Sequence, residues 1–144
     1  MALTKTILLV EDNPNDELMI KVALKDNKIN YDVVVAHDGV EALDYLFRTG
    51  PYKERDKDIM PQLILLDINI PKISGLEVLR KIRENTPTRF IPVIILTASK
   101  EEKDLMYAYK LGANSFLEKS VDFKVFYESV KQMGIYWLGY NATP

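Results

Sequence analysis

Five short apolar runs alternate along this chain with longer segments whose apolar residues recur at helical spacing. The runs at residues 6–10, 63–66 and 92–96 consist almost entirely of aliphatic side chains. Such runs are typical of strands that are buried on both faces of a parallel sheet. The runs at residues 31–36 and 114–117 are shorter or more polar. We therefore expect the first three strands at the centre of a sheet and the other two at its edges.

Helix-start signals precede the intervening segments, and the predicted N-caps are Asn13, Asp38, Ser74, Ser99 and Asp122. The helices that follow are expected to end near residues 25, 47, 85, 111 and 133, where stop signals include Pro87 and Gly112. Helical spacing predicts the following inward side chains: Leu18 and Val22; Leu76, Leu79 and Ile82; Phe123, Tyr127, Val130 and Met133.

Strands that alternate with helices predict an α/β fold with a parallel sheet and right-handed crossovers. The central and edge assignments favour the flavodoxin-like (βα)5 doubly wound sheet, with strand order 2-1-3-4-5. The 144 residues contain no internal repeat, linker or shift in composition. We therefore interpret residues 1–144 as a single domain.

Composition narrows the class of protein. The formal net charge of −2 argues against a general nucleic-acid binder, which needs a basic face. The chain has no cysteine and a single histidine, His37, so thiolate catalysis, cysteine-held zinc and multi-histidine metal sites are excluded. The apolar runs are too short to span a bilayer, and the N-terminal run is too short for a secretory signal. The expectation is a cytoplasmic protein without a membrane segment.

Functional side chains follow four of the predicted strands. Asp12 comes after the first strand, Asp67 after the third, Thr97 after the fourth and Lys119 after the fifth. Because parallel strands all end on one side, these side chains are expected to converge on one edge of the sheet, where open α/β folds bind ligands. Each residue alone is a weak signal, whereas four at successive strand ends predict a functional site.

The charges in this set predict a cation site. Glu11, Asp12 and Asp67 together carry −3. Two carboxylates about 4 Å apart repel by about 4 kcal/mol at an effective dielectric of 20. Ligation by oxygen atoms, including one or two carboxylates, suits Mg²⁺. The ion and Lys119 would balance the three carboxylates, and the backbone carbonyl of Asn69 is well placed as a further ligand.

Such a site is suited to phosphoryl transfer onto a carboxylate, which needs an aligned nucleophile and cations around the phosphoryl oxygens. Asp67, on a central strand, is the expected nucleophile and phosphoacceptor. Lys119 would pair with Asp67 or its phosphate, and Thr97 would donate its hydroxyl to a phosphate oxygen.

The site segments match a known family. V-E-D at 10–12, L-D-I-N-I-P at 66–71 with Gly75, L-T-A at 96–98 and F-L-E-K at 116–119 resemble the motifs of response-regulator receiver domains of two-component signalling. The resemblance covers about residues 4–133 and leaves an aromatic tail at 134–144.

This resemblance implies that a sensor histidine kinase donates a phosphoryl group to Asp67. It also implies that Thr97 and Phe116 act as the switch, with Thr97 drawn toward the phosphate and Phe116 turning inward. The stretch at 49–62, the Lys119-Ser120 pair and the aromatic tail resemble single-domain regulators of bacterial phytochrome kinases. The family usually has a cis proline after the lysine. A cis bond before serine would cost about 2.5–4 kcal/mol, so the geometry of this peptide is left open.

Several alternatives remain. A phosphatase of the aspartyl-phosphate type usually needs a second acid where this chain has Asn69, and a flavodoxin needs a phosphate-cradling loop where Glu11 and Asp12 would repel phosphate. The third alternative is a receiver-fold binding module that works without phosphorylation. The complete set of functional residues argues against it.

Two segments have two interpretations each. The charge-rich stretch at 49–62 is either a solvated surface loop or a functional loop. Residues 136–140 either pack on their own domain or form a partner contact. One hypothesis is a homodimer through the helix after Ser99, the strand at 114–117, the helix after Asp122 and this tail. With no residues left for an effector domain, output by protein contact is expected.

Overall fold

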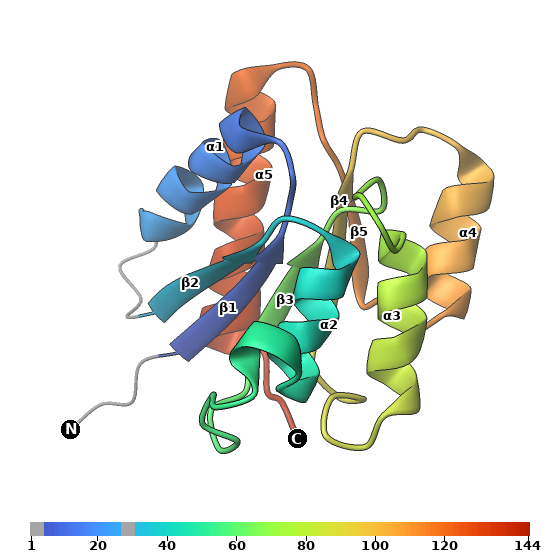
Figure 1. Ribbon diagram of the computed structural model, residues 1–144. Helices are drawn as coiled ribbons and strands as arrows, with labels where there is room; N and C mark the ends of the chain where they lie inside the picture. The colour runs from blue at the N-terminus through green and yellow to red at the C-terminus, as the bar shows by residue number, and fades with distance from the viewer. Residues whose placement is uncertain (1–4, 27–30) are drawn as a thin grey trace.

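The computed structural model describes residues 5–26 and 31–144 and contains a five-stranded parallel sheet in the order β2-β1-β3-β4-β5 (Figure 1). Its strands are β1 (Lys5–Val10), β2 (Tyr31–Ala36), β3 (Leu63–Leu66), β4 (Val93–Thr97) and β5 (Ser115–Glu118). Every residue of β3 and β4 is buried, whereas most residues of β2 and β5 are partly exposed, because each edge strand lacks a neighbour on one side. The predicted strand order and the central and edge positions are confirmed.

Five α-helices connect and flank the strands: α1 (Pro14–Lys25), α2 (Gly39–Phe47), α3 (Gly75–Glu84), α4 (Glu102–Lys110) and α5 (Phe123–Ile135). The helices α1 and α5 cover one face of the sheet, and α2, α3 and α4 cover the other (Figure 1). Each face has its own core. Ile20 and Val130 pack with the strands on the first face, and Leu46, Val78 and Ala108 do so on the second. The flavodoxin-like fold is confirmed.

Four of the predicted N-caps accept hydrogen bonds from first-turn amides, namely Asn13, Asp38, Ser74 and Asp122. The prediction for Ser99 is wrong. The helix α4 begins at Glu102, and its N-cap Glu101 makes no side-chain cap. The hydroxyl of Ser99 instead accepts the amide of Glu101 and donates to Asp104, 2.6 Å away. Ser99 thus stabilises a turn before the helix and not the helix end itself.

Three side chains predicted to point inward are exposed. Leu18 and Val22 of α1 are 65% and 46% exposed, and Phe123 at the start of α5 is also exposed. The buried residues of α1 are Met19, Ile20, Ala23 and Leu24. Because α1 carries apolar residues on neighbouring faces, periodicity alone does not decide which face meets the sheet. In α5, Phe126 takes the inward place, whereas Val130 and Met133 are buried as predicted.

The stretch between α2 and β3 is held by one arginine. After the 3₁₀ turn η1 (Gly50–Tyr52), the Arg55 guanidinium lies over the Tyr45 ring and Nε donates to the Tyr45 carbonyl at 2.8 Å. It also donates to the carbonyls of Leu46 and Ile59. Most side chains of the stretch are exposed. It is a surface loop whose middle is fixed to α2.

The tail has one face packed on its own domain. The helix α5 continues into the π-helical turn η2 (Tyr136–Tyr140), where Leu138 is buried and its carbonyl accepts from Lys5 Nζ at 2.6 Å. Tyr136 and Tyr140 point outward and are exposed. The inner half of the tail completes the core, and the outer half remains available for contact.

Within residues 5–26 and 31–144, no helix combines the length and the apolar character that crossing a membrane requires.

Candidate functional site

Three acidic side chains meet at the carboxyl ends of β1 and β3. The amide of Glu11 donates to the Ala36 carbonyl at 3.0 Å, and the amide of Asp67 donates to the Val10 carbonyl at 3.1 Å. The sheet ladder therefore extends to the acidic residues and fixes their backbones. Glu11 and Asp67 are 1% and 6% exposed, whereas Asp12 is exposed to solvent.

The acidic cluster has the geometry of a cation site. Carboxylate oxygens of Glu11, Asp12 and Asp67 lie within 4.8 Å of one another. Oxygens at this spacing can share one hard divalent ion, and the negative charge of the cluster favours it. The amide of Asn69 donates to Asp67 Oδ1 at 3.0 Å and so orients this carboxylate. That the Asn69 carbonyl is a further ligand stays a prediction.

Lys119 extends into the cluster from the end of β5. Its Nζ lies 2.6 Å from Glu11 Oε1, 2.7 Å from Asp67 Oδ2 and 2.9 Å from Asp16 Oδ2, and its side chain is 9% exposed. Lys119, Glu11 and Asp67 were expected to meet, whereas Asp16 was not predicted. One signal was available in the sequence. The helix after Asn13 starts at the same sheet edge, so its first turn borders the site.

Burial and hydrogen bonding shift the pKa values of Glu11 and Lys119. Burial raises the pKa of Glu11 to about 7, although the hydrogen bond from Lys119 opposes the shift. Burial also acts to lower the pKa of Lys119, but hydrogen bonds to Asp16, Asp67 and Glu11 outweigh it and hold this pKa above its usual range. Lys119 is therefore a permanent cation near neutral pH, and its single charge does not balance the carboxylates around it.

Thr97 and Phe116 lie on the neighbouring strands. Thr97 is the last residue of β4 and is fully buried, and its Oγ1 accepts the amide of Ser99 at 3.2 Å. Its carbonyl accepts the amide of Lys119 at 2.7 Å, so the two strand ends are tied together. Phe116 on β5 is half-buried against the core below α2, α3 and α4. The Lys119-Ser120 peptide is trans.

Gly75 at the start of α3 permits a close backbone approach. Its amide donates to the carbonyl of Ile68 at 2.9 Å. A Cβ atom at Gly75 would overlap the carbonyl oxygen of Asp67. Only glycine lets α3 begin this close to the loop that carries Asp67.

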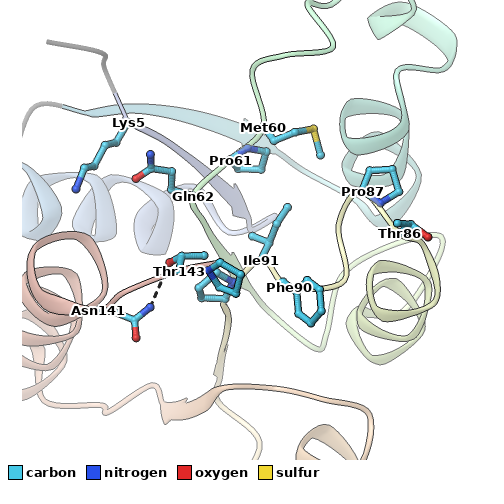
Figure 2. Close-up of a pocket in the computed structure, with 12 residues that line it drawn as sticks. Lys5, Met60, Pro61, Gln62, Thr86, Pro87, Phe90, Ile91, Asn141 and Thr143 are labelled. Atoms are coloured by element: carbon cyan, nitrogen blue, oxygen red, sulfur yellow. Dashed lines mark hydrogen bonds between the residues drawn. The ribbon is translucent and has the colours of Figure 1, made fainter.

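A cavity of about 490 Å³ lies at the opposite edge of the sheet (Figure 2). Lys5, Pro61, Phe90, Pro92 and Asn141 are among the residues that line it, and they gather around the amino ends of β1, β3 and β4. None of the predicted site residues lines this cavity. The acidic residues Glu11, Asp12 and Asp67 lie together instead at the carboxyl edge of the sheet.

The fold and this cluster define a class of protein. The family profile of the response regulator receiver domain matches residues 7–131. The chain belongs to this family, which acts in two-component signalling.

Particular relatives match over nearly the full chain. Response regulator Rcp1 of Synechocystis sp. is 37% identical over 140 residues, which are 97% of this chain and 93% of that protein. The crystal structure of the phosphorylated cyanobacterial phytochrome response regulator RcpA has a TM-score of 0.92 at 37% identity and 99% coverage of both chains. The Mn²⁺-bound form of Rcp1 has a TM-score of 0.91 at 36% identity, with 97% of this chain and 99% of that chain covered. The chain is thus similar to phytochrome response regulators along its whole length.

Proposed function

We propose that this receiver domain accepts a phosphoryl group on Asp67 from a sensor histidine kinase, in a reaction that requires Mg²⁺. The observation that carries the proposal is the buried Asp67 carboxylate, which shares an acidic cluster with Glu11 and Asp12 and lies 2.7 Å from Lys119 Nζ. In the reaction, an Asp67 oxygen bonds to phosphorus while the P–N bond to the kinase histidine breaks. The imidazole nitrogen keeps the electron pair of that bond.

The surrounding residues have distinct parts in this scheme. Glu11, Asp12, Asp67 and the Asn69 carbonyl would hold the ion, which neutralises charge on the phosphoryl oxygens when bound. Lys119 would pair with the phosphoryl group as a point charge. Thr97 Oγ1 accepts the Ser99 amide, so its hydroxyl can donate to a phosphoryl oxygen. Phe116, on the strand next to Thr97, would turn inward with it.

The similarity to phytochrome response regulators supports a further proposal about the partner kinase. We infer that the donor is a phytochrome-type kinase, because the full-length similarity is to Rcp1 and RcpA. We further infer that residues 1–144 act as one cytoplasmic receiver domain, a phosphoacceptor and not a conventional enzyme. The net charge of −2 supports output through protein contacts rather than nucleic-acid binding.

Intact mass spectrometry tests the phosphoacceptor assignment. The native chain and Asp67→Asn are incubated with acetyl phosphate, with and without Mg²⁺. We expect one added phosphoryl group that requires both Mg²⁺ and Asp67. If neither acetyl phosphate nor beryllofluoride changes the protein, the proposal is overturned and a phosphorylation-independent binding module takes its place.

We also propose a homodimer through α4, β5, α5 and the tail. Met106, Tyr107 and Tyr109 on α4 are exposed and line a hollow of about 600 Å³ with two lysines. Exposed tyrosines of the tail add apolar surface of the kind that interfaces use. Sedimentation equilibrium with and without beryllofluoride tests this proposal. A monomer at high concentration in both states would contradict it.

A further inference from the structure

We propose that Asp16 is a positioning residue of this site, which holds the Lys119 ammonium beside Asp67 while the other partners of Lys119 change. The inference rests on the proposed phosphoacceptor function and adds a residue to it. Asp16 Oδ2 lies 2.9 Å from Lys119 Nζ, on the first turn of α1.

The ammonium of Lys119 has a full set of carboxylate partners. A lysine ammonium carries three N–H donors. Lys119 directs them to Glu11, Asp16 and Asp67, at 2.6, 2.9 and 2.7 Å. Its position is therefore fixed by three carboxylates from three different segments of the chain.

Two of these three carboxylates have a second task. Glu11 and Asp67 belong to the acidic cluster whose oxygens lie within 4.8 Å of one another. Oxygens that bind a cation or a phosphoryl group attract the ammonium less, or from a different position. Asp16 lies outside that cluster. It is therefore the one carboxylate partner of Lys119 that neither the cation nor the phosphoryl group would engage.

The local structure makes Asp16 a firm anchor. The Asn13 side chain accepts the amides of Asn15 and Asp16 at 2.9 and 3.1 Å, which fixes the first turn of α1. The helix then packs on the sheet through Met19 and Ile20. The Asp16 side chain is 31% exposed, so it retains contact with water and its desolvation cost is modest.

Removal of Asp16 should change the labelling rate of Asp67 in opposite directions under two explanations, a simple charge effect and positioning of Lys119. If Asp16 only added negative charge, its removal would reduce repulsion of an anionic phosphodonor and speed the labelling of Asp67. Positioning predicts that removal slows the labelling, because Lys119 loses its constant partner. The sign of the change therefore separates the two explanations.

The first experiment measures the rate of Asp67 phosphorylation by acetyl phosphate at saturating Mg²⁺, by intact mass. For Asp16→Asn we expect a fall of roughly threefold to tenfold, the range for one partly exposed charge-assisted hydrogen bond. Asp16→Glu should recover much of the rate. Glu17→Gln is the matched control, because this carboxylate pairs with Lys21 and His37 and not with Lys119. An unchanged or faster rate for Asp16→Asn would overturn the proposal.

A double-mutant cycle tests whether Asp16 acts through Lys119. In a Lys119→Met background, Asp16→Asn should have no further effect on the rate, whereas an independent structural role would still lower it. Labelling of the native chain is measured first, so a failure of the phosphoacceptor assignment is seen separately.

The second readout does not depend on labelling. In metal-free protein, the Lys119 ammonium should give a slowly exchanging ¹⁵N signal by NMR. We expect Asp16→Asn to broaden this signal and Glu17→Gln to leave it unchanged. An equally sharp signal in Asp16→Asn would show that the other two carboxylates suffice.

Discussion

At the scale of single residues, Lys119 is the cation that pairs with the buried carboxylates of the acidic edge. It contacts the buried carboxylates of Glu11 and Asp67 at 2.6 and 2.7 Å. We predict that Lys119→Met lowers the free energy of unfolding of the metal-free protein by about 3 kcal/mol. The reason is that the buried carboxylates would be left without their cationic partner. Urea unfolding at pH 8 with a chelator measures the loss, and added Mg²⁺ should recover part of it.

The control for this prediction is Lys21→Met. Lys21 pairs with Glu17 at 3.0 Å on the surface of α1, and both side chains are in contact with solvent. Such a pair contributes less than about 1 kcal/mol. Similar losses of unfolding free energy for Lys119→Met and Lys21→Met would show that Lys119 does not offset repulsion among the buried carboxylates.

A second residue-scale prediction concerns Asp38, the N-cap of α2. A hydrogen bond from the amide of Glu41 lowers the pKa of Asp38, with Lys72 as a further favourable partner. The ionised form is thus favoured by folding, so its contribution is present above the unfolded-state pKa and is lost as the pH falls through the lowered folded-state pKa. Asp38→Ala should cost about 1 kcal/mol at pH 7. The same urea experiment below about pH 3 should show a smaller difference, and an equal difference would contradict the assignment.

The placement of most candidate site residues could be predicted from the sequence because it follows from topology. Asp67 and Lys119 directly follow strands that are easily recognised, and parallel strands must end on one side. Asp16 could not be predicted in the same way. Its role depends on the rotation of α1 about its own axis, which tertiary packing selects.

At the scale of elements, Arg83 at the end of α3 joins three segments. Its guanidinium donates to the carbonyls of Gly112 and Ile91 at 2.9 and 2.7 Å and to Asn114 Oδ1 at 2.7 Å. It therefore fixes the turns that enter β4 and β5, the strands that carry Thr97 and Lys119 at their other ends. We predict that Arg83→Lys lowers stability by about 1.5–3 kcal/mol, since one ammonium cannot reproduce the planar fork.

The matched variant is Arg80→Lys on the same helix. Arg80 pairs with Glu77 and Glu84, and all three side chains are well exposed. Such surface substitutions usually change stability by less than about 0.5 kcal/mol. Thermal unfolding of both variants gives the comparison, and an Arg83→Lys loss no larger than that of Arg80→Lys would contradict the prediction.

Helix starts could be predicted where the capping residue and the amides it binds are close together in the sequence. The caps Asn13 and Asp122 act on their own helices, so sequence alone was sufficient. Ser99 has the same local pattern but bonds to Asp104 instead, because the chain turns once more before α4 begins. Local pattern was also insufficient for Leu18 and Val22. A helix with two apolar faces can pack on the sheet by either face, and the sequence pattern does not decide which.

At the scale of the whole molecule, the exposed face of α1 lies next to the proposed phosphoacceptor site. Leu18 and Val22 are 65% and 46% exposed, and Leu18 follows Asp16 by two residues. Exposed apolar side chains beside a reactive edge are suited to docking a partner that must bring its own reactive group to Asp67. We expect the histidine kinase to bind this face while it transfers the phosphoryl group.

This expectation predicts a separation between two phosphodonors. The double variant Leu18→Ser, Val22→Ser should lower kcat/KM for transfer from an autophosphorylated phytochrome-type kinase by about tenfold, as the loss of a small apolar anchor implies. Labelling by acetyl phosphate should remain unchanged, because a small molecule needs no docking surface. Phe90→Ser removes a similarly exposed side chain at the opposite, amino edge of the sheet and should leave both rates unaltered. If the double variant loses phosphorylation rate equally with both donors, the substitutions have damaged the site itself. If transfer from the kinase is unchanged, the kinase binds elsewhere.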